Sequence, residues 1–301
     1  MQKTTISHLL LLASALIFGV NYWVSKWLTT AIDVQTIVML RVIGSGILFW
    51  ILSFFVVKES LKIKDHLLLA GAAFMGIALN QIFFFSGIHL SNPVDVSIIH
   101  VTNPLFVLIL SALFIKSKIT TPKIAGLVFG AAGALILILK SGQMDFSKDT
   151  LRGNLLIVAN TISYAAYLVI SKPLLNRLKT TTVMKWISLW GIVFVLPFGF
   201  QSMIATNYSE IVLNTWLSLI YLIIIVTFLA YLFSAYALKN LSTTIVSFYI
   251  YLQPLIVASL AIVIGTDKPS LYHLVAAIFI FVGVYFVSKG KLPIGRKKKL
   301  G

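Results

Sequence analysis

The sequence predicts an all-α integral membrane protein of ten transmembrane helices, arranged as two inverted five-helix repeats with both the N and C termini in the cytoplasm. Three observations support this prediction: the composition, the spacing of apolar runs, and a self-similarity at a fixed offset. Hydrophobic residues make up 59% of the 301 residues and charged residues 11%, against about 45–50% and about 25% in soluble domains. A soluble chain of this size could not hide so much apolar surface from water.

Ten apolar runs follow one another along the chain, and connecting segments of at most about 15 residues leave no room for a soluble domain. Each run is expected to be a helix, because only helices and closed barrels satisfy backbone groups in lipid, and the two-residue alternation of a barrel is absent. The runs cover residues 7–25, 36–57, 67–88, 94–115, 123–139, 153–170, 186–204, 215–238, 244–264 and 271–288.

Lysine and arginine fix the expected orientation. Alternate loops carry 18 basic residues on one side, including the tail after residue 288, and five on the other. The basic side is expected to face the cytoplasm, which places both termini there and requires an even number of spans. The predicted units are a first five-helix repeat over 1–140, a second over 141–288, and a basic cytoplasmic tail over 289–301.

The two halves resemble each other at an offset of 150 residues. The matches pair Val96 with Val246, Ser97 with Ser247, Pro104 with Pro254 and Leu105 with Leu255. Because five spans is an odd number, the second half must enter the membrane upside down relative to the first. Inverted repeats are typical of secondary transporters, which bind their substrate near mid-membrane between the repeats.

Polar side chains inside hydrocarbon are costly and need a partner or a water-filled cavity. Amides and phenols at these depths are predicted to line a substrate cavity; for any single residue the alternative is a hydrogen bond between helices. The predicted substrate-binding residues are Asn21, Arg41, Asn80, Gln81, His100, Asn103, Tyr164, Tyr167, Tyr231, Tyr249 and Gln253, and Asn160, Tyr236 and Tyr251 share their spans.

For two of these side chains the sequence allows two interpretations each. Arg41 either binds a substrate carboxylate or makes a structural contact with Asp33, a backbone carbonyl or lipid headgroups. His100, the only histidine well inside a span, either couples transport to protons or is a neutral hydrogen-bonding group. Pro104 and Pro254 are expected to bend their helices and to act as hinges.

All acidic residues fall in loops or at span ends, so no carboxylate relay crosses the predicted membrane core. This pattern favours facilitated diffusion or exchange, or coupling through His100. The absence of cysteine excludes disulfides and thiolate metal sites, and no metal or other cofactor is expected. The basic residues punctuate the apolar runs and form no soluble face, so nucleic acid is not an expected partner.

The chain resembles EamA-type members of the drug/metabolite transporter superfamily. The resemblance lies in Gly87-Ile88-His89-Leu90-Ser91 through Pro104-Leu105-Phe106, in its echo Ala237-Leu238-Lys239-Asn240-Leu241 through Pro254, and in Leu40-Arg41-Val42. It implies a carrier for amino acids, related metabolites or drugs, often an exporter, that works without nucleotide hydrolysis in a prokaryotic cell membrane. One departure is Lys116-Ser117-Lys118, where the family usually has Gly-Glu-Arg; the second half keeps an acid at Asp267.

We therefore expect a multi-pass protein of the cell membrane that exports small polar or amphipathic metabolites by alternating access, without ATP. The alternatives are a flippase for a lipid-linked substrate on the same fold and, less favoured, a membrane-embedded enzyme. An enzyme would need an acid–base pair, a nucleophile or a metal cluster, and the predicted spans offer one histidine, one arginine and no carboxylate. The expected partners are a small-molecule substrate and the lipid bilayer; a homodimer and a monomer are equally compatible with the sequence.

Overall fold

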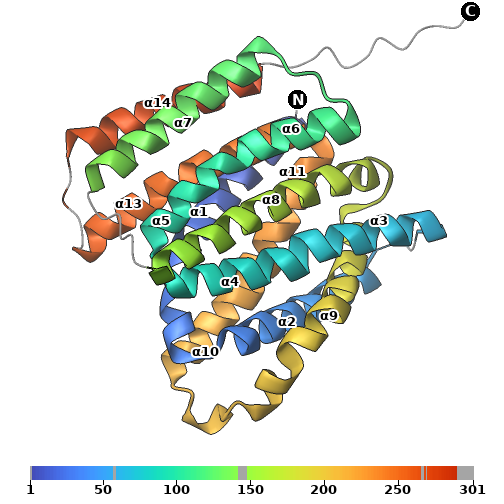
Figure 1. Ribbon diagram of the computed structural model, residues 1–301. Helices are drawn as coiled ribbons and strands as arrows, with labels where there is room; N and C mark the ends of the chain where they lie inside the picture. Colours follow the sequence, from blue (N-terminus) through green and yellow to red (C-terminus); the bar gives the residue numbers. More distant parts are fainter. Residues whose placement is uncertain (1, 57–58, 142–147, 266–267, 269, 290–301) are drawn as a thin grey trace, which may run out of the picture.

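The structure is a computed structural model that describes residues 2–56, 59–141, 148–265, 268 and 270–289. Within these residues the secondary structure is entirely helical, and the elements join into ten helices (Figure 1). The first half contains α1 (Gln2–Ala31), α2 (Val34–Phe54), α3 (Ile63–Ala73) continued by α4 (Asn80–Leu90), α5 (Pro93–Ile99) continued by α6 (Asn103–Ile115), and α7 (Thr121–Ser141). The second half contains α8 (Lys148–Arg177), α9 (Thr180–Ala205), α10 (Leu213–Ile220) continued by α11 (Tyr231–Asn240), α12 (Thr243–Phe248) continued by α13 (Leu252–Ile264), and α14 (Leu271–Lys289).

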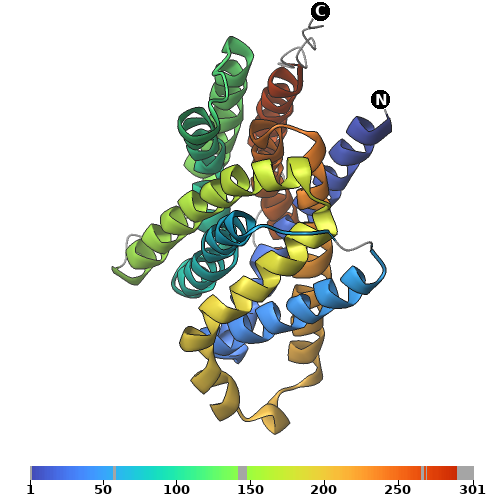
Figure 2. The same cartoon turned by 90° about the vertical axis from the view of Figure 1, so that its right-hand side faces the viewer.

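Eight of the ten described helices are long and apolar enough to cross a membrane. The remaining two, α7 and α14, pack against each other at one edge of the bundle in both views (Figures 1 and 2). Several helices outrun the apolar runs that predicted them: α8 covers residues 148–177, against a run over 153–170. Hydropathy marks only the part of a helix that matches the hydrocarbon layer, so the polar turns at both ends were left out.

The same two irregularities occur in each half. The third helix contains a π-helical segment, Phe74–Leu79 in the first half and Tyr221–Ala230 in the second. The fourth helix contains a 3-10 turn, His100–Thr102 or Tyr249–Tyr251. Each 3-10 turn comes just before a proline, Pro104 or Pro254, which lacks an N–H and crowds the preceding turn.

The two halves interleave. α4 packs along α8, α1 along α11, and α2 along α9, so each of these pairs joins one half to the other. Glycines allow the closest approaches: a Cβ on Gly87 would lie 3.0 Å from the Gly153 carbonyl oxygen, and one on Gly153 2.8 Å from that of Gly87. Small residues at such crossings are typical of membrane helices, which associate through close packing.

One polar clamp joins the end of α1 to the end of α4. Lys26 Nζ donates to the carbonyl oxygen of His89 at 2.7 Å, and His89 Nδ1 donates to the carbonyl oxygen of Thr29 at 3.1 Å. We call this contact the first clamp. Both ends therefore have basic side chains on the exposed carbonyls of a helix C-terminus, which favours positive charge.

An equivalent second clamp joins the end of α8 to the end of α11. Lys172 Nζ donates to the carbonyl oxygens of Leu238, Lys239 and Leu241 at 2.7, 3.2 and 2.9 Å, and Lys239 Nζ donates to that of Leu178 at 2.8 Å. The helix α8 passes both clamps. Its residue Gly153 contacts the end of α4 at Gly87 and Leu90, next to the first clamp, and its residue Lys172, in the second clamp, follows 19 residues later. At about 1.5 Å per residue the clamps lie roughly 28 Å apart, close to the thickness of a hydrocarbon layer.

The predicted tail lies outside the described residues, apart from Lys289 at the end of α14. Asp267 also lies outside them.

Candidate functional site

A cavity of about 90 Å³ lies between helices of both halves. Nine of the predicted residues line it: Asn21, Arg41, Asn80, His100, Asn103, Tyr164, Tyr231, Tyr249 and Gln253. Further lining residues include Ser14, Phe18, Tyr22, Phe84, Asn160, Thr161 and Ser234.

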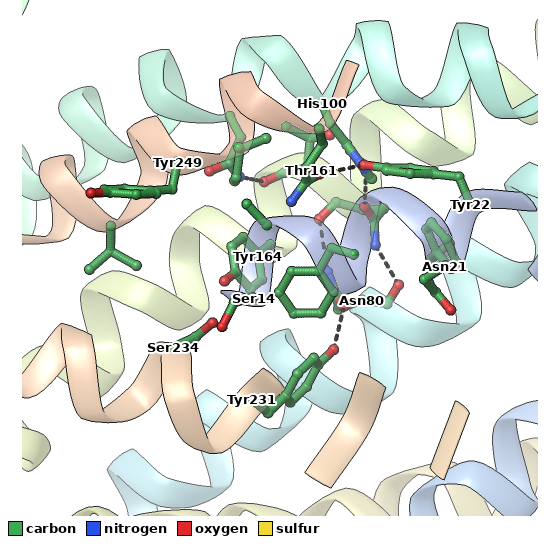
Figure 3. Close-up of a pocket in the computed structure, with 18 of the residues that line it drawn as sticks. Ser14, Asn21, Tyr22, Asn80, His100, Thr161, Tyr164, Tyr231, Ser234 and Tyr249 are labelled. Atoms are coloured by element: carbon green, nitrogen blue, oxygen red, sulfur yellow. Dashed lines mark hydrogen bonds between the residues drawn. The ribbon is translucent and has the colours of Figure 1, made fainter. Parts of the chain in front are cut away.

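Tyr22 of α1 is the centre of a hydrogen-bond network in this cavity (Figure 3). Its hydroxyl donates to Gln253 Oε1 at 2.6 Å and contacts His100 Nδ1. His100 Nε2 lies 2.7 Å from Asn160 Oδ1, and Asn160 Nδ2 donates to the carbonyl oxygen of Asn80 at 2.6 Å. The network thereby ties α1 to the fourth helix of each half, to α8 and to the start of α4.

The protons of this network are interdependent. Because Asn160 donates its amide N–H to a backbone carbonyl, its oxygen faces His100, so His100 Nε2 is the donor of that pair. Because the Tyr22 hydroxyl has one proton, it donates to Gln253 Oε1 only if His100 Nδ1 donates to the Tyr22 oxygen, which would put both protons on the imidazole. A neutral imidazole requires the Gln253 amide to turn over and donate instead. The charge on His100 is thus linked to the orientation of the Gln253 amide, which presents either its oxygen or its nitrogen to Tyr22.

The irregular segments position other lining residues. Asn80 and Tyr231 are the first α-helical residues after the two π-helical segments, and the Tyr231 hydroxyl donates to Asn80 Oδ1 at 3.5 Å (Figure 3). Asn103, after the first 3-10 turn, donates its Nδ2 to the Thr161 carbonyl oxygen at 2.9 Å. Tyr249, in the second 3-10 turn, has its hydroxyl 2.8 Å from His8 Nδ1.

Arg41 is the charged side chain among the described lining residues, and it is only 3% exposed. Its Nε donates to Thr227 Oγ1, which in turn donates to the Leu222 carbonyl oxygen at 2.7 Å. The guanidinium lies over the ring of Phe85, 5.3 Å from the centroid, and over that of Tyr231 at 5.9 Å. The structural contact with Asp33 considered from the sequence is not formed; Asp33 caps α2 by accepting from the backbone N–H groups of residues 35 and 36.

Two predicted residues, Gln81 and Tyr167, do not line the cavity. Gln81 is 1% exposed, and neither atom of its amide has a hydrogen-bond partner among the described residues. The Tyr167 hydroxyl donates to Met184 Sδ at 3.8 Å. Each follows a lining residue, Asn80 or Tyr164, by one or three positions, which turns the side chain by about 100° or 300° around its helix and out of the cavity.

Pro104 and Pro254 are both buried, in the first turns of α6 and α13. Their neighbours Asn103 and Gln253 reach the cavity. The arrangement fits a bend at each position, and the hinge role stays a prediction.

Sequence reasoning missed Ser14, Tyr22, Thr161 and Ser234. A signal was present in the first span: Ser14, Phe18, Tyr22 and Ser25 repeat at the three- and four-residue spacing of one helix face. Tyr22 was counted as apolar there, because a phenol ring fits lipid as well as a cavity. Thr161 and Ser234 are small hydroxyl residues of a kind that also bond to the preceding turn of their own helix, so the pattern does not single them out.

The arrangement suits reversible binding of a small molecule, since amides, hydroxyls and an imidazole supply hydrogen bonds and aromatic rings supply apolar contact. The sequence profile of the EamA-like transporter family matches residues 5–139 and 151–289, one copy on each half. The chain belongs to the EamA-like transporter family. The resemblance seen in the sequence is confirmed, and the EamA chain is a multi-pass transporter of the cell membrane, from a family of transporters and not of enzymes.

Several relatives are similar to this EamA protein. An uncharacterized transporter of Archaeoglobus fulgidus is 26% identical over 227 residues, which cover 75% of this chain and 77% of the relative. The uncharacterized transporter YetK of Bacillus subtilis is 24% identical over 97% of this chain and 90% of its own. A probable amino-acid metabolite efflux pump of Salmonella typhimurium is 24% identical over 79% and 91%.

A solved crystal structure of a protein superposes with a TM-score of 0.72 over 96% of both chains at 18% sequence identity. At that identity the likeness shows the fold alone.

Proposed function

We propose that this EamA-family protein is a secondary transporter that exports small polar or amphipathic metabolites, such as amino acids or related compounds, by alternating access and without ATP. The observation that supports this most is the cavity, which lies near the middle of the long helices and takes polar side chains from both halves. Asn160 and Tyr164, for example, lie near the middle of α8. The name of the Salmonella typhimurium relative, an efflux pump, favours export.

The same proposal includes the topology: ten membrane-crossing helices in two inverted repeats, over 1–140 and 141–288, with both termini cytoplasmic. The recurrence of a π-helical segment and a 3-10 turn in the same helices of each half supports it. The clamps support it as well, because His89 and Lys239 are 150 residues apart in sequence and the two clamps lie roughly 28 Å apart along α8.

Alternating access follows from the clamps in this scheme. Each clamp closes one end of the bundle, so release of one while the other holds would open the cavity to a single side. The helices that bend at Pro104 and Pro254 lead from the clamped ends to the cavity, which makes them the hinges of the motion. Rocking of one repeat against the other is the usual mode of inverted-repeat carriers.

The test is counterflow of labelled amino acids and a small metabolite panel in proteoliposomes. Ala15→Trp would fill the cavity, since Ala15 lines it and is 2% exposed. Ala205→Trp, at the exposed end of α9, is the matched control, because tryptophan is tolerated at membrane interfaces. We expect the wild type and Ala205→Trp to exchange a preloaded compound and Ala15→Trp to lose the exchange.

Exchange at the wild-type rate by a folded Ala15→Trp variant would contradict a central binding site. A folded wild type that exchanges no member of the panel would contradict metabolite transport, and flipping of lipid-linked substrates would be assayed next.

A further inference from the structure

The positive charge of Arg41 has no counter-ion in the part of the chain that the structure describes. The described ion pairs join Asp149 to Arg152 and Asp65 to Arg177, both near helix ends. None of the described acidic residues lines the cavity; they are Asp33, Glu59, Asp65, Asp95, Asp149 and Glu210. A buried cation without a partner is costly, so this charge needs an explanation.

The guanidinium is only partly satisfied by its surroundings. Of its five N–H donors, the one on Nε has an acceptor, Thr227 Oγ1; the two terminal nitrogens form no hydrogen bond with a described residue. The rings of Phe85 and Tyr231 stabilise the cation from its sides, while the side chain lines the cavity. Paired terminal N–H donors match the two oxygens of a carboxylate.

The rest of the lining selects the remainder of the ligand. Phe18, Phe84 and Tyr164 offer aromatic surface. An ammonium group would find no acidic partner among the described lining residues and would be repelled by Arg41. An amino-acid zwitterion therefore leaves one of its two charges unpaired in this cavity.

We infer that the cavity binds organic monoanions, a carboxylate joined to an apolar or aromatic body, in preference to zwitterionic amino acids, with Arg41 as the anion-binding residue. The inference rests on the proposed function, in which this cavity is the transport site, and narrows its substrate class. A carrier that moves a net negative charge alone is driven outward by an inside-negative membrane potential, by about 50-fold in concentration per 100 mV, which agrees with export.

The experiment uses two series of compounds that share a body and differ in charge. The first contains indole-3-acetate, indole-3-acetamide, tryptophan and tryptophanamide; the second contains phenylacetate, phenylacetamide and phenylalanine. Binding to the purified full-length protein in nanodiscs is measured by calorimetry. A charge-assisted pair corresponds to about 10- to 100-fold in affinity, so each acid is expected to bind at least about tenfold more tightly than its amide and its amino acid.

Variants assign the preference to the guanidinium. Arg41→Gln is expected to bind acid and amide equally, and Arg41→Lys, which keeps the charge without the paired donors, to retain part of the preference. Thr227→Val removes the Nε acceptor and is expected to keep it. Because Arg41→Gln removes the donor to Thr227 Oγ1 and could unfold the protein, the comparison of acid with amide on the wild type and on Arg41→Lys decides independently.

Equal binding of acid and amide by the wild type, no binding of either acid, or a full acid preference in folded Arg41→Gln would each overturn the inference. Ala15→Trp separates this failure from failure of the proposed function. Charge-independent binding that is lost in Ala15→Trp would overturn the anion preference and retain the cavity as the site. Binding that survives in Ala15→Trp would count against the cavity itself.

Discussion

At the scale of single residues, Tyr22 joins two of the cavity residues chosen from the sequence, although the sequence did not single out Tyr22 itself. Its two side-chain partners, His100 and Gln253, lie 78 and 231 positions away, in the irregular fourth helices of the two halves. Hydropathy identifies amides and an imidazole at depth because their cost in lipid is large. Hydropathy does not identify a tyrosine as a site residue, because its ring is stable in lipid. The hydrogen-bond partner of its hydroxyl depends on the fold.

Tyr22→Phe should destabilise the protein more than the matched change Tyr251→Phe. Transmembrane side-chain hydrogen bonds are worth about 0.6 kcal/mol on average and about 1.7 at most, so the loss of two predicts a fall in the free energy of unfolding of about 1–3 kcal/mol. Tyr251 is equally buried, but its hydroxyl makes one long contact of 3.5 Å with the Leu127 carbonyl oxygen. Unfolding by SDS titration measures both variants; equal losses would show that the network adds nothing.

Arg41 illustrates the same limit from the other side. A charge within an apolar run is visible in the sequence, so Arg41 was a candidate from the start. Its acceptor Thr227 lies 186 positions away in a π-helical segment. The spacing of residues along the chain could not predict this contact, nor that Asp33 would cap its own helix and leave Arg41 without it.

At the scale of helices, the sequence predicted the irregularities next to prolines but not the π-helical segments. Prolines at 104 and 254 predicted bends, and the 3-10 turns lie beside them. The π-helical segments Phe74–Leu79 and Tyr221–Ala230 contain no proline, so nothing in the apolar pattern marked them. Their position directly before Asn80 and Tyr231 agrees with the frequent occurrence of π-helical turns at functional sites.

The clamps predict a local effect that differs in size between the two ends. Lys172→Ala removes three hydrogen bonds, two from the last carbonyls of α11 and one from that of Leu241 just after it, whereas Lys26→Ala removes one exposed bond from α4. Hydrogen exchange measured by mass spectrometry should therefore accelerate over residues 236–244 in Lys172→Ala, by at least about tenfold for 1.4 kcal/mol or more lost. Lys26→Ala should show a smaller acceleration over residues 86–94.

Each variant should leave the other end unchanged, because the clamps are roughly 28 Å apart along α8. Acceleration at both ends in either variant would show that the clamps do not act separately.

At the scale of the whole molecule, most of the fold class followed from the sequence. The bilayer admits few architectures, so composition and run length predict an all-helical membrane protein, and the offset of 150 residues predicts two like halves. The pairing of α2 with α9 and of α4 with α8 did not follow. Membrane helices associate through small residues and shape complementarity rather than through apolar burial. Such packing depends on side-chain shapes that the pattern of apolar residues does not specify.

The central claim is that one cavity serves both sides of the membrane in turn, and the absence of cysteine allows a direct measurement. Ser234→Cys places a single thiol in the cavity lining, and Ser171→Cys places one at a fully buried position outside that lining. Each variant is treated with a membrane-impermeant thiol reagent in right-side-out and in inside-out vesicles. Alternating access predicts that the Ser234→Cys thiol reacts from both sides and the Ser171→Cys thiol from neither; reaction of the Ser234→Cys thiol from one side only, or from neither, would contradict the account.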